Sequence, residues 1–241
     1  MNINDLEEKI RQSESMSLSA AFPILMRKVY LWMAMALAIS GLTAYSVAAS
    51  PGLVQLIYSN SLVMWGCIIA ELVMVWKISN SVAKENRSLA TTTLMFIIFS
   101  ALNGVTLSSI FVLFAPAAIV KTFVITAGTF GVMAAYGYFT SRDLTKIGGL
   151  LFMALIGVII ASVVNMFLHS SGLDLVVSII GVLVFVGLTA WDSQQIKMSL
   201  AMAPDLGETS QKLALTGALS LYLDFVNLFL YLLRVFGGSR D

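Results

Sequence analysis

Charged side chains are scarce in this sequence. Only 11% of its 241 residues are Asp, Glu, Lys or Arg, whereas 59% are hydrophobic and the mean hydropathy is +0.91. A soluble domain contains about one quarter charged residues, so the composition excludes a soluble domain and indicates an integral membrane protein. The formal net charge of +1 comes without a cluster of basic residues, and binding to nucleic acid is therefore not expected.

Cysteine and histidine are equally rare, with Cys67 and His169 as the single examples. One cysteine excludes an intrachain disulfide, and one histidine builds neither a metal cluster nor a convincing catalytic triad. Two aspartates at membrane depth could form an intramembrane aspartyl protease. The glycine-flanked aspartate of that class is missing, however, because Asp224 stands in Tyr-Leu-Asp-Phe. We therefore expect no catalytic residue, no enzyme activity and no cofactor, with His169 exposed at a helix end.

Long apolar runs fill most of the chain. Seven runs approach the roughly 20 residues that cross a bilayer as a helix, and short turns rich in proline, glycine and polar residues separate them. They fall at about 25–49, 62–79, 89–114, 117–140, 147–168, 173–196 and 213–236. We predict an all-α integral membrane protein with seven transmembrane helices. Residues 1–24 are expected to form a cytosolic tail, and residues 25–238 a single transmembrane domain.

The basic residues favour one side of the membrane, which predicts the orientation. Of the fourteen Lys and Arg residues, Lys121, Arg234 and Arg240 lie on one side of this arrangement, which leaves eleven on the other. No secretory signal precedes the first run, since residues 1–20 are polar. We expect a cytoplasmic N-terminus and an external C-terminus. If the last run were re-entrant, the C-terminus would return to the cytosol.

The last run, 213–236, carries a polar stripe. At 100° per residue its polar side chains fall within an arc of about 80°, and the rest of the helix is aliphatic or aromatic, with Tyr222 as an exception. The stripe consists of Thr216, Ser220, Asp224, Asn227, Tyr231 and Arg234. Because lipid cannot satisfy such a stripe, this helix either lies at the middle of the bundle or lines a path through it. Hydrogen bonding between helices is an alternative role for Thr216, Ser220 and Tyr231.

Asp224 needs a partner, because a charge at membrane depth costs at least about 2.5 to 3.5 kcal/mol. Asp192 lies near the end of the preceding, antiparallel run, and two carboxyl groups in one site can share a proton. If both ionise about 4 Å apart, they repel each other by about 4 kcal/mol at an effective dielectric constant of 20. We predict that Asp192 and Asp224 form a pH-sensing and gating pair. The alternative for Asp192 is an interfacial acid that is solvated or paired with Lys197.

Three further side chains supply oxygen atoms at depth, namely Glu71, Asn103 and Asn227. Carboxylate and amide oxygens are hard ligands that suit Ca²⁺, and a conducting path needs weak, incomplete coordination. We predict that these three residues line an ion pathway and that Asp192 and Asp224 hold Ca²⁺ transiently. For Glu71 a role as a neutral hydrogen-bonding partner is equally open.

Four motifs resemble the Bax inhibitor-1 family, also called the transmembrane Bax inhibitor motif family. They are SALNGVTLSSIF (100–111), YFTSRDLTKIGGLLF (138–152), AWDSQQI (190–196) and LSLYLDFVNLFLYLLR (219–234). The similarity extends from about residue 21 to 238, and the last motif is highly specific. In this family six helices surround a central C-terminal helix, which agrees with the polar stripe.

The resemblance implies a pH-sensitive Ca²⁺ leak, with a di-aspartyl pair at Asp192 and Asp224 and an intramembrane acid at Glu71. Relatives have a latch arginine after the second span, but no arginine stands at the matching place here, which leaves Lys84 or Arg87 as substitutes. Some bacterial relatives bind a membrane-bound AAA protease. The alternative is therefore a non-conducting regulator of that protease or another membrane partner. A multi-pass protein of a bacterial inner membrane is expected in either case, with lipid and, for a leak, calcium ions as its contacts.

Overall fold

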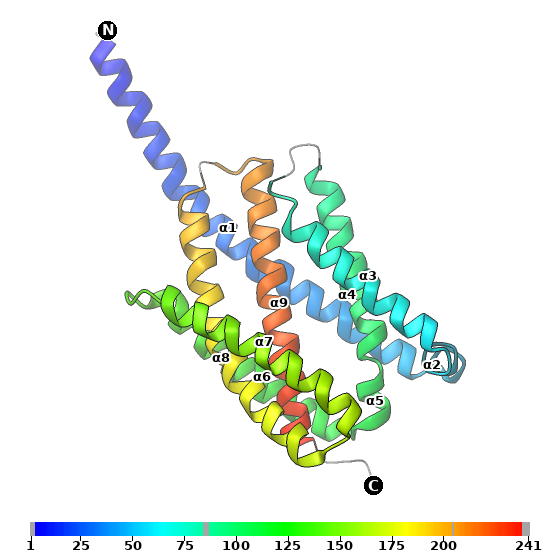
Figure 1. The fold of residues 1–241 in the computed structure, drawn as a ribbon. Helices are drawn as coiled ribbons and strands as arrows, with labels where there is room; N and C mark the ends of the chain where they lie inside the picture. Colours follow the sequence, from blue (N-terminus) through cyan, green and yellow to red (C-terminus); the bar gives the residue numbers. More distant parts are fainter. Residues whose placement is uncertain (1–2, 84–86, 204, 238–241) are drawn as a thin grey trace.

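The computed structural model describes residues 3–83, 87–203 and 205–237, with side chains described from residue 21 onward. Every regular element in this part of the chain is an α-helix (Figure 1). The helices are α1 (Ile3–Ala48), α2 (Pro51–Tyr58), α3 (Ser61–Ser79), α4 (Leu89–Leu107), α5 (Ser109–Leu113), α6 (Pro116–Phe139), α7 (Thr145–Leu168), α8 (Ser171–Ala201) and α9 (Glu208–Phe236). Seven stretches of these helices are long and apolar enough to span a membrane. The predicted all-α fold with seven transmembrane helices is confirmed.

Several helices are longer than their apolar runs. The run predicted at 173–196 belongs to a helix that continues to Ala201, and the helix of the last run begins at Glu208 rather than at 213. Hydropathy marks only the apolar part of a helix, whereas its backbone hydrogen bonds continue into the polar interface. Helix α9 is continuous to Phe236, which excludes a re-entrant last span. Helix α1 likewise runs without a break from Ile3 into the span that begins at Ala21, so the division into a tail and a domain stays a prediction.

Short polar residues at the helix ends explain several boundaries. The side chain of Ser88 accepts a hydrogen bond from the backbone N–H of Thr91 at the start of α4, and Asn60 and Ser170 cap α3 and α8 in the same way. Such caps satisfy N–H groups that have no partner within the helix. At the end of α7, His169 takes a left-handed conformation with φ 51° and is exposed, as predicted.

Helix α9 occupies the centre of the bundle. It packs against α1, α3, α4, α6 and α8, while α7 packs mainly on α8 (Figure 1). The apolar window of α9 is 61% buried, compared with 6% to 44% for the other spans. The predicted arrangement around a central C-terminal helix is thus confirmed. The start of α1 and the end of α9 lie at opposite ends of the molecule, as an odd number of crossings requires (Figure 1).

The outer surface is apolar and suits a lipid environment. Large side chains such as Leu62 and Phe139 are 82% and 78% exposed, whereas water would disfavour such exposure. The interior is close-packed around Tyr222, which makes edge contacts with Phe96 and Phe99. Helices approach closely where glycine permits it: a Cβ added to Gly137 of α6 would lie 2.0 Å from the carbonyl oxygen of Ala190 in α8.

Candidate functional site

The carboxyl groups of Asp192 and Asp224 meet between the antiparallel helices α8 and α9. Asp224 is only 5% exposed, and the two carboxyl groups are close enough to interact electrostatically. Oδ2 of Asp224 is buried and receives no hydrogen bond from an N–H or hydroxyl donor in the described part of the chain. Ionised carboxyl groups can only accept hydrogen bonds. A hydrogen bond between the two acids would therefore need a proton on one of them.

A cavity reaches Asp192 from the end of the bundle where α8 is connected to α9, and its lining mixes polar side chains with the apolar Ile196, Leu200 and Leu213. Its volume is about 140 Å³, and its lining includes Asp192, Gln195 and Ser199 of α8 with Thr216 and Ser220 of α9. Thr216 and Ser220, the first two residues of the predicted stripe, therefore line a cavity against α8 rather than facing lipid. Asp192 lies at the inner end of the cavity, because it is farther from the connecting loop than the other α8 residues that line it.

On the other side of the pair, aromatic packing closes the same seam. The ring of Tyr231 fills a notch at Gly181 of α8, where an added Cβ would lie 2.7 Å from a ring carbon. The ring also stacks on Phe185 at a centroid distance of 5.8 Å, and the guanidinium of Arg234 lies 5.4 Å from its centroid. Four residues of the stripe thus face α8, with a cavity at Thr216 and Ser220 on one side of Asp224 and the packed ring of Tyr231 on the other.

A second polar network lies on the opposite face of α9. Both carboxyl oxygens of Glu71 accept hydrogen bonds, one from Asn103 Nδ2 at 3.1 Å and one from Thr106 Oγ1 at 2.9 Å. The hydroxyl of Tyr222 donates to Asn103 Oδ1 at 2.7 Å and lies 2.7 Å from Ser40 Oγ. Helices α1, α3, α4 and α9 are joined by this chain of contacts. The network is equally suited to a neutral and to an ionised Glu71, so both of its predicted roles stay open.

The central helix presents the two networks to different neighbours. Tyr222 and Asp224 are two residues apart, which turns their side chains about 160° away from each other around the helix axis. Asp224 faces α8, and Tyr222 faces α4 and α1. The two acidic centres therefore lie on different sides of α9, and Asn103 of α4 connects Tyr222 to Glu71.

The structure brings together Asp192 with Asp224, and Glu71 with Asn103, but it leaves Asn227 apart. The side-chain amide of Asn227 donates to the carbonyl of Leu223, one turn earlier in the same helix, at 2.8 Å. Its part in an ion pathway stays a prediction.

Sequence reasoning missed the roles of Tyr222, Ser40 and Thr106 in the second network. Tyr222 stood out only as an exception to the stripe. A signal was present for Thr106, which lies three residues after Asn103 and so shares its helix face.

The basic residues proposed as partners of the acids contact other groups. The Nζ atom of Lys197 donates to the carbonyl of Tyr138 at 2.7 Å, and Arg87 donates to the carbonyl of Lys77 at the end of α3. Lys84 lies outside the described residues. Arg87 thus ties α3 to the start of α4, and its role as a substitute for the latch arginine stays a prediction.

The described part of the chain contains no group of three or more His, Cys, Asp or Glu side chains that could hold a metal ion. The di-acid contact supplies two carboxyl groups, and the cavity beside it supplies hydroxyl and amide oxygens. Ligands of this kind suit a hard cation that is bound weakly.

Comparison with known proteins decides the family. The family model described as "Inhibitor of apoptosis-promoting Bax1" matches residues 23–241. The chain belongs to the Bax inhibitor-1 family. The resemblance found in the four motifs is thereby confirmed, and the protein is a multi-pass integral membrane protein of that family.

Bacterial members of the family match nearly the whole chain. The "Inner membrane protein YbhL" of Escherichia coli is 47% identical over 217 residues, which cover 89% of this chain and 92% of that protein. An uncharacterised protein of Rickettsia prowazekii is 40% identical and covers 90% of each chain. An uncharacterised membrane protein of Streptococcus pyogenes is 37% identical over 88% of this chain and 91% of its own length.

Proposed function

We propose that this Bax inhibitor-1 protein is a pH-sensitive Ca²⁺ leak channel of a bacterial inner membrane, gated by the contact between Asp192 and Asp224. The observation that carries the proposal is the position of this contact. It joins the central helix α9 to α8, at the inner end of a cavity lined in part by polar side chains, and on the same helix as the packed ring of Tyr231. A relative that is 47% identical is named an inner membrane protein.

The shared proton holds the gate closed. When it is lost, two carboxylates about 4 Å apart repel each other by about 4 kcal/mol at an effective dielectric constant of 20. Driving a two-state equilibrium from 1:99 to 99:1 takes about 5.5 kcal/mol, so the repulsion supplies most of the free energy needed to part α8 from α9. The shared proton is present at low pH and is lost as the pH rises. The leak is therefore expected to open with rising pH.

Parting these helices would also open the seal. Tyr231 lies on the same helix as Asp224 and closes the seam only while its ring fills the notch at Gly181. A displacement of α9 away from α8 would withdraw the ring and connect the cavity to the other side of the membrane. A Ca²⁺ ion entering the cavity would meet the oxygens of Gln195, Ser199, and then the two acids.

Flux through the purified protein tests the proposal. The protein is reconstituted into liposomes that contain a Ca²⁺-sensitive dye, and the initial rate is measured across about pH 5 to 8, a range in which a shared carboxyl proton can be lost. We expect a rate above that of protein-free liposomes that rises with pH. A rate independent of pH would exclude the gate, and the absence of flux would favour a non-conducting role.

One feature favours that second candidate, a regulator that binds a membrane-bound AAA protease or another membrane protein. Helix α1 continues ahead of its membrane span as residues 3–20 and projects from the bundle (Figure 1). A projecting helix is suited to contact a partner. Deleting residues 2–20 separates the two roles, because a regulator would lose its partner whereas a leak in liposomes would persist.

A further inference from the structure

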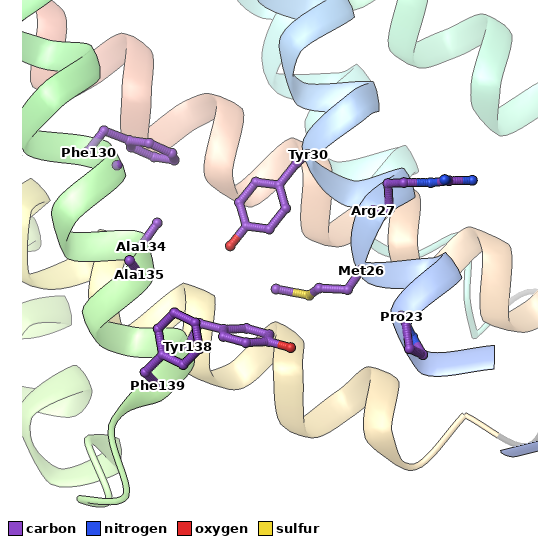
Figure 2. Close-up of a pocket in the computed structure, with 10 residues that line it drawn as sticks. Pro23, Met26, Arg27, Tyr30, Phe130, Ala134, Ala135, Tyr138 and Phe139 are labelled. Carbon is purple, nitrogen blue, oxygen red and sulfur yellow. The ribbon is translucent and has the colours of Figure 1, made fainter. Parts of the chain in front are cut away.

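An apolar groove opens sideways between α1 and α6. Both helices pack on α8 and α9, and the space between them has a volume of about 600 Å³, a size that is common for small-molecule sites. Met26 and Tyr30 of α1 point toward Tyr138 and Phe130 of α6 across this groove (Figure 2). Arg27 extends away from these side chains (Figure 2), so that the groove itself is apolar.

The groove lies within one leaflet of the membrane. Its walls are the first turns of the span of α1, from Pro23 to Tyr30, and the last turns of α6, from Phe130 to Phe139. At 1.5 Å per residue these walls are about 10 to 14 Å long, close to half of the roughly 30 Å hydrocarbon core. A sideways opening at this depth faces acyl chains rather than water.

A polar pocket with basic side chains adjoins the outer end of the groove. It has a volume of about 230 Å³, and its lining includes Arg142, Lys197 and Asp143. Tyr138 connects the two spaces, because Lys197 donates to its carbonyl oxygen at 2.7 Å and lies 5.3 Å from its ring centroid. Hydrogen bonds from the side chain and backbone of Thr145 hold the pKa of Asp143 below its usual value. With Asp143 ionised, the two cations leave this pocket with a net positive charge.

We propose that the groove and the basic pocket together bind one anionic phospholipid of the surrounding bilayer. An acyl chain lies along Met26, Tyr30 and Phe130, and the phosphate contacts Arg142 and Lys197. The order of the two spaces supports this occupant, since the apolar part lies at membrane depth and the charged part at the interface, as in a phospholipid. Arginine also presents paired donors that match phosphate oxygens.

Two glycines of α6 give a matched pair of variants. A Cβ added to Gly131, which lines the groove, would meet no atom within 4 Å, and the same holds for Gly128, which lies one turn earlier and does not line it. Both positions are exposed. Gly131→Phe therefore fills the groove without a clash in the backbone, and Gly128→Phe adds the same side chain outside it.

Native mass spectrometry of the purified full-length protein in detergent tests the proposal, with phosphatidylglycerol and phosphatidylcholine of identical acyl chains added separately. We expect one phosphatidylglycerol to be retained in preference to phosphatidylcholine by the wild type and by Gly128→Phe. Gly131→Phe should weaken this binding about tenfold or more, and Arg142→Gln should remove the preference between the two head groups.

Equal retention by Gly131→Phe and Gly128→Phe would overturn the proposal, and so would equal binding of the two lipids by the wild type. The same spectra report the number of chains. A wild-type dimer that Gly131→Phe converts to a monomer would show instead that a second copy covers the groove, which would also overturn the proposal.

Discussion

Replacing Asp224 by asparagine and by alanine should have opposite effects on the leak. In Asp224→Asn the new side-chain amide can donate a hydrogen bond to the carboxylate of Asp192 without any bound proton. The contact between α8 and α9 would then persist at every pH, and flux should be low and independent of pH. Asp224→Ala removes both the contact and the repulsion. Flux should then be higher than in the asparagine variant at low pH, and again independent of pH.

The magnitude follows from the position of the two acids. With the two carboxyl groups in contact, ionisation of both adds about 4 kcal/mol of repulsion, and each 1.36 kcal/mol corresponds to a factor of ten. The ratio of open to closed protein is therefore expected to change by up to about 1,000-fold across the pH range of the wild type. In both Asp224 variants this change should vanish, since only one carboxyl group remains.

The assay is dye-reported Ca²⁺ entry into liposomes, with Asp174→Asn as the control. Asp174 is an acid in the first turn of α8, about 27 Å along the helix from Asp192, and its amide variant should keep the wild-type pH profile. Thermal unfolding in detergent establishes that each variant is folded. A wild-type pH profile in Asp224→Asn would refute the proton-sharing gate. A lower flux in the alanine variant than in the asparagine variant would refute the idea that the contact closes the path.

Three further predictions concern the seal, the second network and the packing. Tyr231→Ala should raise flux at low pH because the notch at Gly181 is left open; unchanged flux in the liposome assay would show that the ring is not the seal. Tyr222→Phe should lower the free energy of unfolding by about 1 to 3 kcal/mol, since Asn103 Oδ1 loses its donor; an unaltered thermal midpoint would contradict this. Gly137→Ala should destabilise the bundle because its Cβ would collide with a carbonyl of α8, and an unchanged midpoint would count against the close contact.

The fold could be predicted from the sequence because lipid imposes a simple rule. Each span must be apolar and about 20 residues long, and the seven runs satisfy this rule directly. The short helix α2 was not predicted, since it is too short to cross the membrane, and the run predicted at 89–114 is divided into α4 and α5. Their boundaries depend on local features, such as Pro51 at the start of α2, whose fixed φ suits a first helical turn.

The site was only partly predictable. The stripe on α9 indicated that Asp224 faces protein, and chain order favoured α8 as its neighbour in space, so the meeting with Asp192 followed from topology. The contact of Tyr222 with Asn103 joins residues 119 positions apart. No periodicity in one helix reports such a contact, because it depends on how α4 is placed against α9. The seal by Tyr231 was missed for a similar reason, since the notch that receives the ring is made by Gly181 of another helix.

The position of Tyr222 opposite Asp224 gives the central helix a mechanical consequence. A helix turns as a nearly stiff rod, so a rotation that separates the carboxyl groups on one face must strain the hydrogen bonds of Tyr222 on the other. Those hydrogen bonds contribute about 1 kcal/mol each and therefore resist small rotations of α9. In the proposed gate, a change at Glu71 would therefore reach the distant pair of Asp192 and Asp224 through Asn103 and Tyr222, without direct contact between the acids.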